Sequence, residues 1–244
     1  MIPCSDDSLE YRGRLEELER ENLALRDFAW AASHDLKEPL RGISLHLEWL
    51  ANSLNGQLEA PQAQHLEHAL KSAQIVASVL TAVESYVRLR TEAFEWTTVD
   101  CGDVVANVTL LLRCKIIETG GSVTWNGLPC VRSSETLLTH VFLNLVDNAI
   151  RYRAKDPPRI KIAGDLQGNE WNFSVIDNGI GIDEKYREYI FEPFGRLNSR
   201  RTSGSGIGLA LCRTAVERLG GRIWAEASQS GGGSVFRFTL PAET

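Results

Sequence analysis

The histidine at position 34 lies in a run of residues suited to phosphoryl or proton transfer. Asp35 follows it directly. A carboxylate beside an imidazole raises the basicity of the ring and is able to accept its proton during attack. Pro39 lacks the N–H that would bond the carbonyl of Asp35, so we expect the helix to bend just after His34. Taken alone, an exposed histidine is more often a solvated side chain, and that alternative stays open.

Two asparagines, Asn144 and Asn148, lie one helical turn apart in an apolar run and share a face. An amide oxygen is a hard ligand that suits Mg²⁺, and the nearby Arg151 and Arg153 suit phosphate. The alternative is a helix whose two polar residues cap or bridge core groups.

Two glycine-rich clusters follow. The first, Asp177-Asn-Gly-Ile-Gly-Ile182, ends an apolar strand. Its glycines let the backbone approach a ligand closely, and its aspartate suits the amine of an adenine. The second, Gly204-Ser-Gly-Ile-Gly208, opens a helix, where backbone N–H groups suit a triphosphate. It follows no strand, so it is not a dinucleotide fingerprint, and the chain has no GxxxxGK[ST] phosphate loop. A plain turn is the alternative for the first cluster.

The segment between these clusters contains Phe191-Glu-Pro-Phe-Gly-Arg196, followed by polar and basic residues up to Ser203. An exposed loop with aromatic anchors is typical of a lid that closes over a ligand. A surface loop whose phenylalanines fill the core explains the pattern equally well.

Two long helices are expected to position His34. Residues 9–54 and 62–92 carry apolar residues at alternating steps of three and four. The first seam is interrupted between Ala32 and Leu40, where an interruption locally unwinds a supercoil. A single hairpin has little to pack against, so we expect two chains to pair into a four-helix bundle. An ordinary amphipathic surface helix is the alternative for the first part.

From about residue 95 short β-rich runs alternate with helices, which predicts an α+β layer of sheet against helices. The Gly231–Gly233 run predicts a hairpin turn. Strands are expected at 122–125, 159–163, 171–176, 222–225 and 234–240, and helices at 101–118, 134–153 and 206–219.

The composition excludes several classes of protein. A net charge of −6 over 244 residues argues against a nucleic-acid or membrane-surface binder. The five cysteines form no C-x-x-C pair, which favours free thiols in a reducing compartment. The sequence has no apolar run long enough to span a membrane and no signal peptide. We expect a cytoplasmic chain, or the cytosolic piece of a larger sensor.

The order and spacing of the motifs together resemble those of the sensor histidine kinases of two-component systems. The resemblance covers about residues 20–244. Its motifs are Ser33–Arg41 for the H-box, Leu143–Ala149 for the N-box, Asp177–Gly181 for G1, Phe191–Phe194 for the F-box and Gly204–Gly208 for G2.

This resemblance implies a multidomain α and α+β fold. Residues 1–24 would be an N-terminal coiled-coil signalling helix. Residues 25–94 would form an antiparallel hairpin that dimerises as a four-helix bundle and carries the phosphoacceptor. Residues 95–244 would form a Bergerat-type α/β sandwich that binds ATP. The linker near residues 90–98 would act as a hinge.

The resemblance also implies roles for single residues. His34 would accept the phosphoryl group, Asp35 would be its general base, and Arg196 would reach the γ-phosphate. Asn148 would bind Mg²⁺, and Arg151 and Tyr152 replace a Lys-Tyr pair of the family. The residues implied to bind ATP are Asn144, Asn148, Arg151, Tyr152, Asp177, Gly179, Gly181, Phe191, Phe194, Gly204, Gly206 and Gly208.

Two departures from related sequences bear on side reactions. Asn144 occupies the position where ATPases of this fold have a glutamate that activates water, and an amide is a poor base, so we expect slow hydrolysis. Glu38 stands where many relatives have a Thr or Asn that positions water, which predicts a weak phosphatase.

The partners implied are a second copy of the chain and an aspartate of a response regulator. We expect the upstream sensor domain to be absent from this chain. Two rival functions stay open: an ATPase or serine kinase of the same nucleotide fold, and a pseudokinase that binds nucleotide and serves as a dimeric scaffold.

Overall fold

The computed structural model describes residues 6–54, 56–195, 206–228 and 232–242, which form two units, Met1–Val87 and Arg88–Thr244. The first unit is a hairpin of two long helices, α1 (Asp6–Ser53) and α2 (Ala60–Thr91). The last turn of α2 belongs to the second unit. Helix α1 is continuous through Pro39. In the described part of the chain, none of the helices is long and apolar enough to cross a membrane.

The second unit is built on a five-stranded sheet in the order β2-β4-β5-β7-β6. Strands β2 and β4 are parallel, and the other neighbours are antiparallel. The bounds are β2 Ser122–Trp125, β4 Arg159–Gln167, β5 Glu170–Ile176, β6 Ile223–Ala227 and β7 Ser234–Pro241. The five strands expected from the sequence are therefore confirmed, and β6 and β7 form the hairpin predicted around the glycine run.

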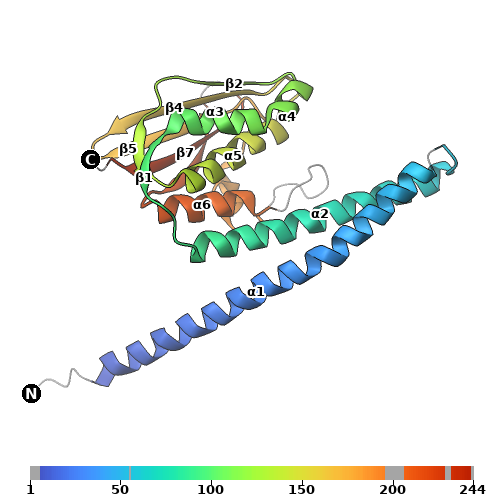
Figure 1. Ribbon diagram of the computed structural model, residues 1–244. Helices are drawn as coiled ribbons and strands as arrows, with labels where there is room; N and C mark the ends of the chain where they lie inside the picture. The colour runs from blue at the N-terminus through green and yellow to red at the C-terminus, as the bar shows by residue number, and fades with distance from the viewer. Residues whose placement is uncertain (1–5, 55, 196–205, 229–231, 243–244) are drawn as a thin grey trace, which may run out of the picture. The chain divides into compact units, whose positions relative to one another are not determined.

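Helices α3 (Cys101–Leu111), α5 (Glu135–Arg151) and α6 (Gly208–Arg218) lie along one face of this sheet (Figure 1). Aromatic residues join the two layers. Phe173 on β5 stacks on its cross-strand partner Phe238 on β7 with ring centroids 4.8 Å apart. Phe142 of α5 meets both rings edge-on, and all three side chains are fully buried. This cluster holds α5 at a fixed height over the sheet.

Smaller elements depart from the sequence expectation. The expected helix 101–118 is broken at Leu112, where α3 ends and α4 (Arg113–Glu118) begins. A separate two-stranded sheet pairs β1 (Thr97–Asp100) with β3 (Cys130–Ser133). Two 3₁₀ turns, η1 (Glu184–Tyr186) and η2 (Tyr189–Phe191), follow β5.

We predict that Phe238→Ala lowers the free energy of unfolding of the second unit by about 3–5 kcal/mol, because it leaves a cavity between β7 and α5. Urea unfolding followed by tryptophan fluorescence measures the loss. Leu166→Ala is the control, since that side chain on β4 is 55% exposed. Equal losses in the two variants would contradict the assignment of the core.

Candidate functional site

His34 lies on α1 with 68% of its side chain exposed. Its Nδ1 atom is 3.3 Å from Oδ1 of Asp35, whose side chain is 81% exposed. Because Nδ1 faces the carboxylate, Nε2 is the nitrogen directed away from this contact. The structure therefore places the two residues as the sequence predicted, with the acid beside the ring.

An ion pair between the two helices of the hairpin lies close to His34. Lys37 on α1 donates to Oε2 of Glu84 on α2. The Glu84 side chain is only 17% exposed, so this pair is partly shielded from solvent. Since Lys37 lies three residues after His34, the pair fixes the register of the hairpin at the level of the histidine. Sequence reasoning did not identify it, because a lysine and a glutamate on two helices carry no sign of their pairing.

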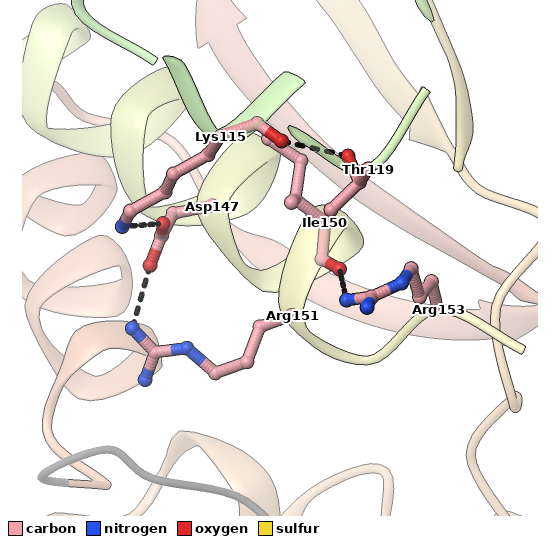
Figure 2. Close-up of polar contacts among 6 residues, drawn as sticks. All are labelled: Lys115, Thr119, Asp147, Ile150, Arg151 and Arg153. Atoms are coloured by element: carbon pink, nitrogen blue, oxygen red, sulfur yellow. Dashed lines mark hydrogen bonds and ion pairs between the residues drawn. The ribbon is translucent and has the colours of Figure 1, made fainter. Parts of the chain in front are cut away.

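One face of α5 carries most of the polar residues of the N-box. Asn144, Asp147, Asn148 and Arg151 occupy positions i, i+3, i+4 and i+7 of the helix and are all half-buried. Asp147 accepts from Lys115 at 2.6 Å through one oxygen and from Arg151 at 2.7 Å through the other (Figure 2). The carboxylate thus holds the Arg151 guanidinium along the helix face that also presents the two asparagines.

The second glycine cluster meets this face at the start of α6. A Cβ atom on Gly208 would lie 2.7 Å from Oδ1 of Asn144, closer than side-chain carbons approach. Nδ2 of Asn144 donates to the carbonyl of His140 at 2.8 Å. Gly206 has a φ of 73°, a conformation that favours glycine. The N-box and the start of α6 therefore pack closely, and a side chain at Gly208 would displace the amide of Asn144.

Asp177, at the end of β5, is 8% exposed. Its Oδ1 accepts from the backbone N–H of Gly179 at 2.8 Å and of Ser234 at 3.1 Å. Burial raises the pKa of this carboxyl, and the two backbone hydrogen bonds oppose the rise. Asp177 is thus a carboxylate held nearly out of water, with both backbone bonds on one oxygen.

Two further contacts close the first glycine cluster around Asp177. The carbonyl of Tyr152, which caps α5, accepts from the Ile180 N–H at 3.0 Å, and a Cβ on Gly179 would lie 2.5 Å from this oxygen. Gly233, with a φ of 92°, approaches Asp177 so closely that a Cβ would be 1.9 Å from its carbonyl oxygen. The sequence indicated only a hairpin turn there, so the contribution of Gly233 and Ser234 was missed.

The two phenylalanines of the F-box lie in different environments. Phe191 is 1% exposed and packs edge-on against Phe236 of β7, with the Arg213 guanidinium 4.8 Å from its ring. Phe194 is 55% exposed and has a φ of 65°. Phe191 therefore fills the core, as one of the two sequence interpretations expected. Arg196 and Gly204 lie outside the described residues.

These elements define a class of protein: an α-helical hairpin with an exposed histidine, joined to a sheet domain whose glycine turns surround a buried aspartate. The family model described as Histidine kinase-, DNA gyrase B-, and HSP90-like ATPase matches residues 133–244. The model described as His Kinase A (phospho-acceptor) domain matches residues 24–92. The chain therefore belongs to the histidine kinase family.

Individual relatives support the assignment of the chain to this family. Cyanobacterial phytochrome A of Nostoc sp. is 37% identical over 226 residues, which are 92% of this chain and 29% of the relative. The chain thus spans less than a third of that protein. The solved catalytic domain of histidine kinase ThkA is 30% identical with a TM-score of 0.54, covering 61% of this chain and 97% of that one.

A further solved structure shares the fold across more of the chain. It is histidine kinase ThkA in complex with response regulator protein TrrA, with a TM-score of 0.63 and 24% identity. The match covers 96% of this chain and 66% of that one.

We predict that Asp177 accepts from the adenine amine of a bound nucleotide, and that Asp177→Asn weakens nucleotide binding about tenfold to a hundredfold, because an amide nitrogen would face that amine with a second donor. The raised pKa of Asp177 means that its burial as a carboxylate costs stability at neutral pH, and this cost disappears as pH falls toward the usual pKa of the group. The variant should therefore unfold at an equal or higher temperature than the parent at pH 7. Titration with a fluorescent ATP analogue and a thermal melt without nucleotide test both parts. A lower melting temperature would show that the carboxylate is structural.

Proposed function

We propose that this chain is a protein histidine kinase that uses ATP to phosphorylate its own His34 and passes the phosphoryl group to an aspartate of a response regulator. The observation that carries the proposal is the exposed imidazole of His34 beside the Asp35 carboxylate. His34 lies on a helix within the segment matched by the phosphoacceptor family model.

ATP binds, in this proposal, between the N-box face of α5 and the two glycine clusters. Asp177 accepts from the adenine amine through Oδ2, because Oδ1 already holds two backbone N–H groups. The start of α6 offers backbone donors to the phosphates, and Arg151 lies on the same helix face as Asn144 and Asn148.

Asn148 provides an oxygen ligand of the kind that Mg²⁺ takes. Among the described residues, no three His, Cys, Asp or Glu side chains gather to hold a metal ion. A neutral amide of this kind fits a cation whose remaining ligands are phosphate oxygens and water. Mg²⁺ would then neutralise charge on the triphosphate, while Asn148 orients it.

The transfer step uses few protein groups. The lone pair on Nε2 of His34 attacks the γ-phosphorus, a P–N bond forms, and the bond to the departing ADP oxygen breaks. The positive charge that develops on the ring is met by Asp35, which holds the proton on Nδ1. Asn144 cannot act as a strong base toward water, so transfer to His34 outcompetes hydrolysis.

The transfer brings a nucleotide bound by the second unit to His34 of the first, and contacts just after the junction of the two units bear on where the chain bends. Arg218 of α6 donates to the carbonyl of Leu89, and its guanidinium lies 4.7 Å from the ring of Phe94. Leu89 is 2% exposed. Because these contacts attach residues 89–94 to the second unit, we infer that the hinge lies before Leu89 rather than across residues 90–98.

Two partners belong to the proposal. Helices α1 and α2 expose large apolar side chains, among them Leu25, Leu36 and Ile43, which suit pairing with a second copy. The solved complex of ThkA with TrrA supports a response regulator as the acceptor. The weak phosphatase expected from Glu38 and the cytoplasmic location stay predictions.

We predict that the chain incubated with γ-labelled ATP and Mg²⁺ acquires acid-labile, alkali-stable phosphate, and that His34→Ala loses this label entirely. The alanine removes the imidazole that attacks the γ-phosphorus in this proposal. ATP binding should persist, because the proposed nucleotide site is in the other unit. Substitution of another exposed histidine, His46→Ala, is the matched control. Acid-stable label would indicate a serine kinase, and absence of label in the parent would indicate a scaffold. Label that survives His34→Ala would move the acceptor elsewhere.

A further inference from the structure

The indole of Trp30 is stacked on the imidazole of His34. The two rings have centroids 5.6 Å apart and planes inclined by only 20°. The residues are separated by one helical turn, so their side chains are neighbours on the surface of α1. This distance lies within the range of favourable aromatic pairs.

The helical seam does not explain an aromatic residue at this position. Trp30 points about 130° away from the middle of the seam formed by Ala29 and Ala32, taking about 100° per residue. It is 47% exposed. A side chain placed this far off the seam does not face a helix that pairs along the seam, which leaves the contact with His34 as its clearest role.

Two contacts constrain the imidazole in complementary ways. Stacking on Trp30 restricts the plane of the ring, because rotation about the Cβ–Cγ bond would break the overlap. The 3.3 Å approach of Asp35 to Nδ1 selects which edge of the ring faces the carboxylate. Together they leave Nε2, with its lone pair in the plane of the ring, directed outward, the arrangement that in-line attack on a phosphoryl group requires.

The charge that develops during transfer strengthens the same contact. Attack by Nε2 turns a neutral imidazole into a phosphoimidazolium cation. An indole face attracts a cation more strongly than a neutral ring, so the stack is tighter after attack than before. An interaction that strengthens along the reaction raises the rate of the chemical step.

We propose that Trp30 is a positioning residue for phosphorylation of His34, acting by stacking on the imidazole and by stabilising the cationic ring. The inference rests on the proposed function, in which His34 accepts the phosphoryl group. It assigns Trp30 a part in the transfer step and none in ATP binding.

The test compares initial rates of acid-labile labelling in the full chain at several ATP concentrations. Trp30→Ala should lower kcat about threefold to tenfold. The KM for ATP should not change, because the nucleotide site is in the other unit. Trp30→Phe should recover most of the rate, since it restores a ring face. Trp49→Ala is the matched control, because Trp49 lies equally far off the seam of Leu47 and Leu50 and is 65% exposed.

Proton NMR supplies a readout that a structural role would not move. The imidazole C–H resonances of His34, assigned by their loss in His34→Ala, should be shifted upfield by the indole in the parent chain. They should move toward those of an unstacked histidine in Trp30→Ala and stay unchanged in Trp49→Ala. If circular dichroism shows that Trp30→Ala has lost helicity, Trp30→Leu is used in its place, because leucine keeps apolar bulk without a ring. The same rate and NMR outcomes then decide the test.

The outcomes separate this inference from the proposed function. A parent chain that labels on His34 while Trp30→Ala labels at the same rate overturns the role of Trp30 alone. Equal losses in Trp30→Ala and Trp49→Ala, or a loss confined to KM, also overturn it. A parent chain without acid-labile label, or label that survives His34→Ala, overturns the proposed function whatever Trp30 does.

Discussion

The glycine turns of the second unit are arranged around one buried carboxylate. Asp177 is kept almost out of water by two backbone N–H groups, one from the turn that follows β5 and one from the start of β7. These bonds offset only part of the cost of burying the charge, since the pKa of the group stays raised by burial. A carboxylate that the fold stabilises incompletely is typical of a group retained for binding.

Meeting that constraint requires backbone to approach backbone more closely than side chains permit. Gly233 lies against the carbonyl of Asp177, Gly179 against that of Tyr152, and Gly208 against the amide of Asn144. A methyl group at Gly233 or Gly179 would collide with backbone, whereas one at Gly208 would displace the end of the Asn144 side chain. The glycines therefore join β5, the end of α5 and the start of α6 into one cluster, and the Phe142 aromatic packing holds α5 at the height where this cluster closes.

The elements that the sequence predicted correctly are those with a clear apolar periodicity or a local motif. The five main strands and the long helices follow from apolar spacing, and so does the place of Asp177 at the end of a strand and of Asn148 on a helix face, while their roles stay predictions. Strands β1 and β3 were missed although they are no shorter than β2; they pair only with each other, outside the main sheet. The break at Leu112 has no Gly or Pro to mark it. The contribution of Ser234 to the Asp177 site was hidden because the two residues are 57 positions apart, and only the register of β5 with β7 brings them together.

The proposed reaction has two sites, one for the nucleotide and one for the phosphoacceptor, and they need opposite environments. A nucleotide site gains from burial, because a fixed, dry carboxylate discriminates between donors. A phosphoacceptor must be reached by a donor that another domain carries, so His34 has to remain exposed. An exposed side chain on a helix has no surrounding core to orient it, and its orientation can come only from its neighbours on that helix. Residues three or four positions away on the helix are its neighbours, and the adjacent residue is also near. Trp30 and Asp35 make these contacts with the ring, so the local geometry of α1 supplies the preorganisation that burial supplies to Asp177.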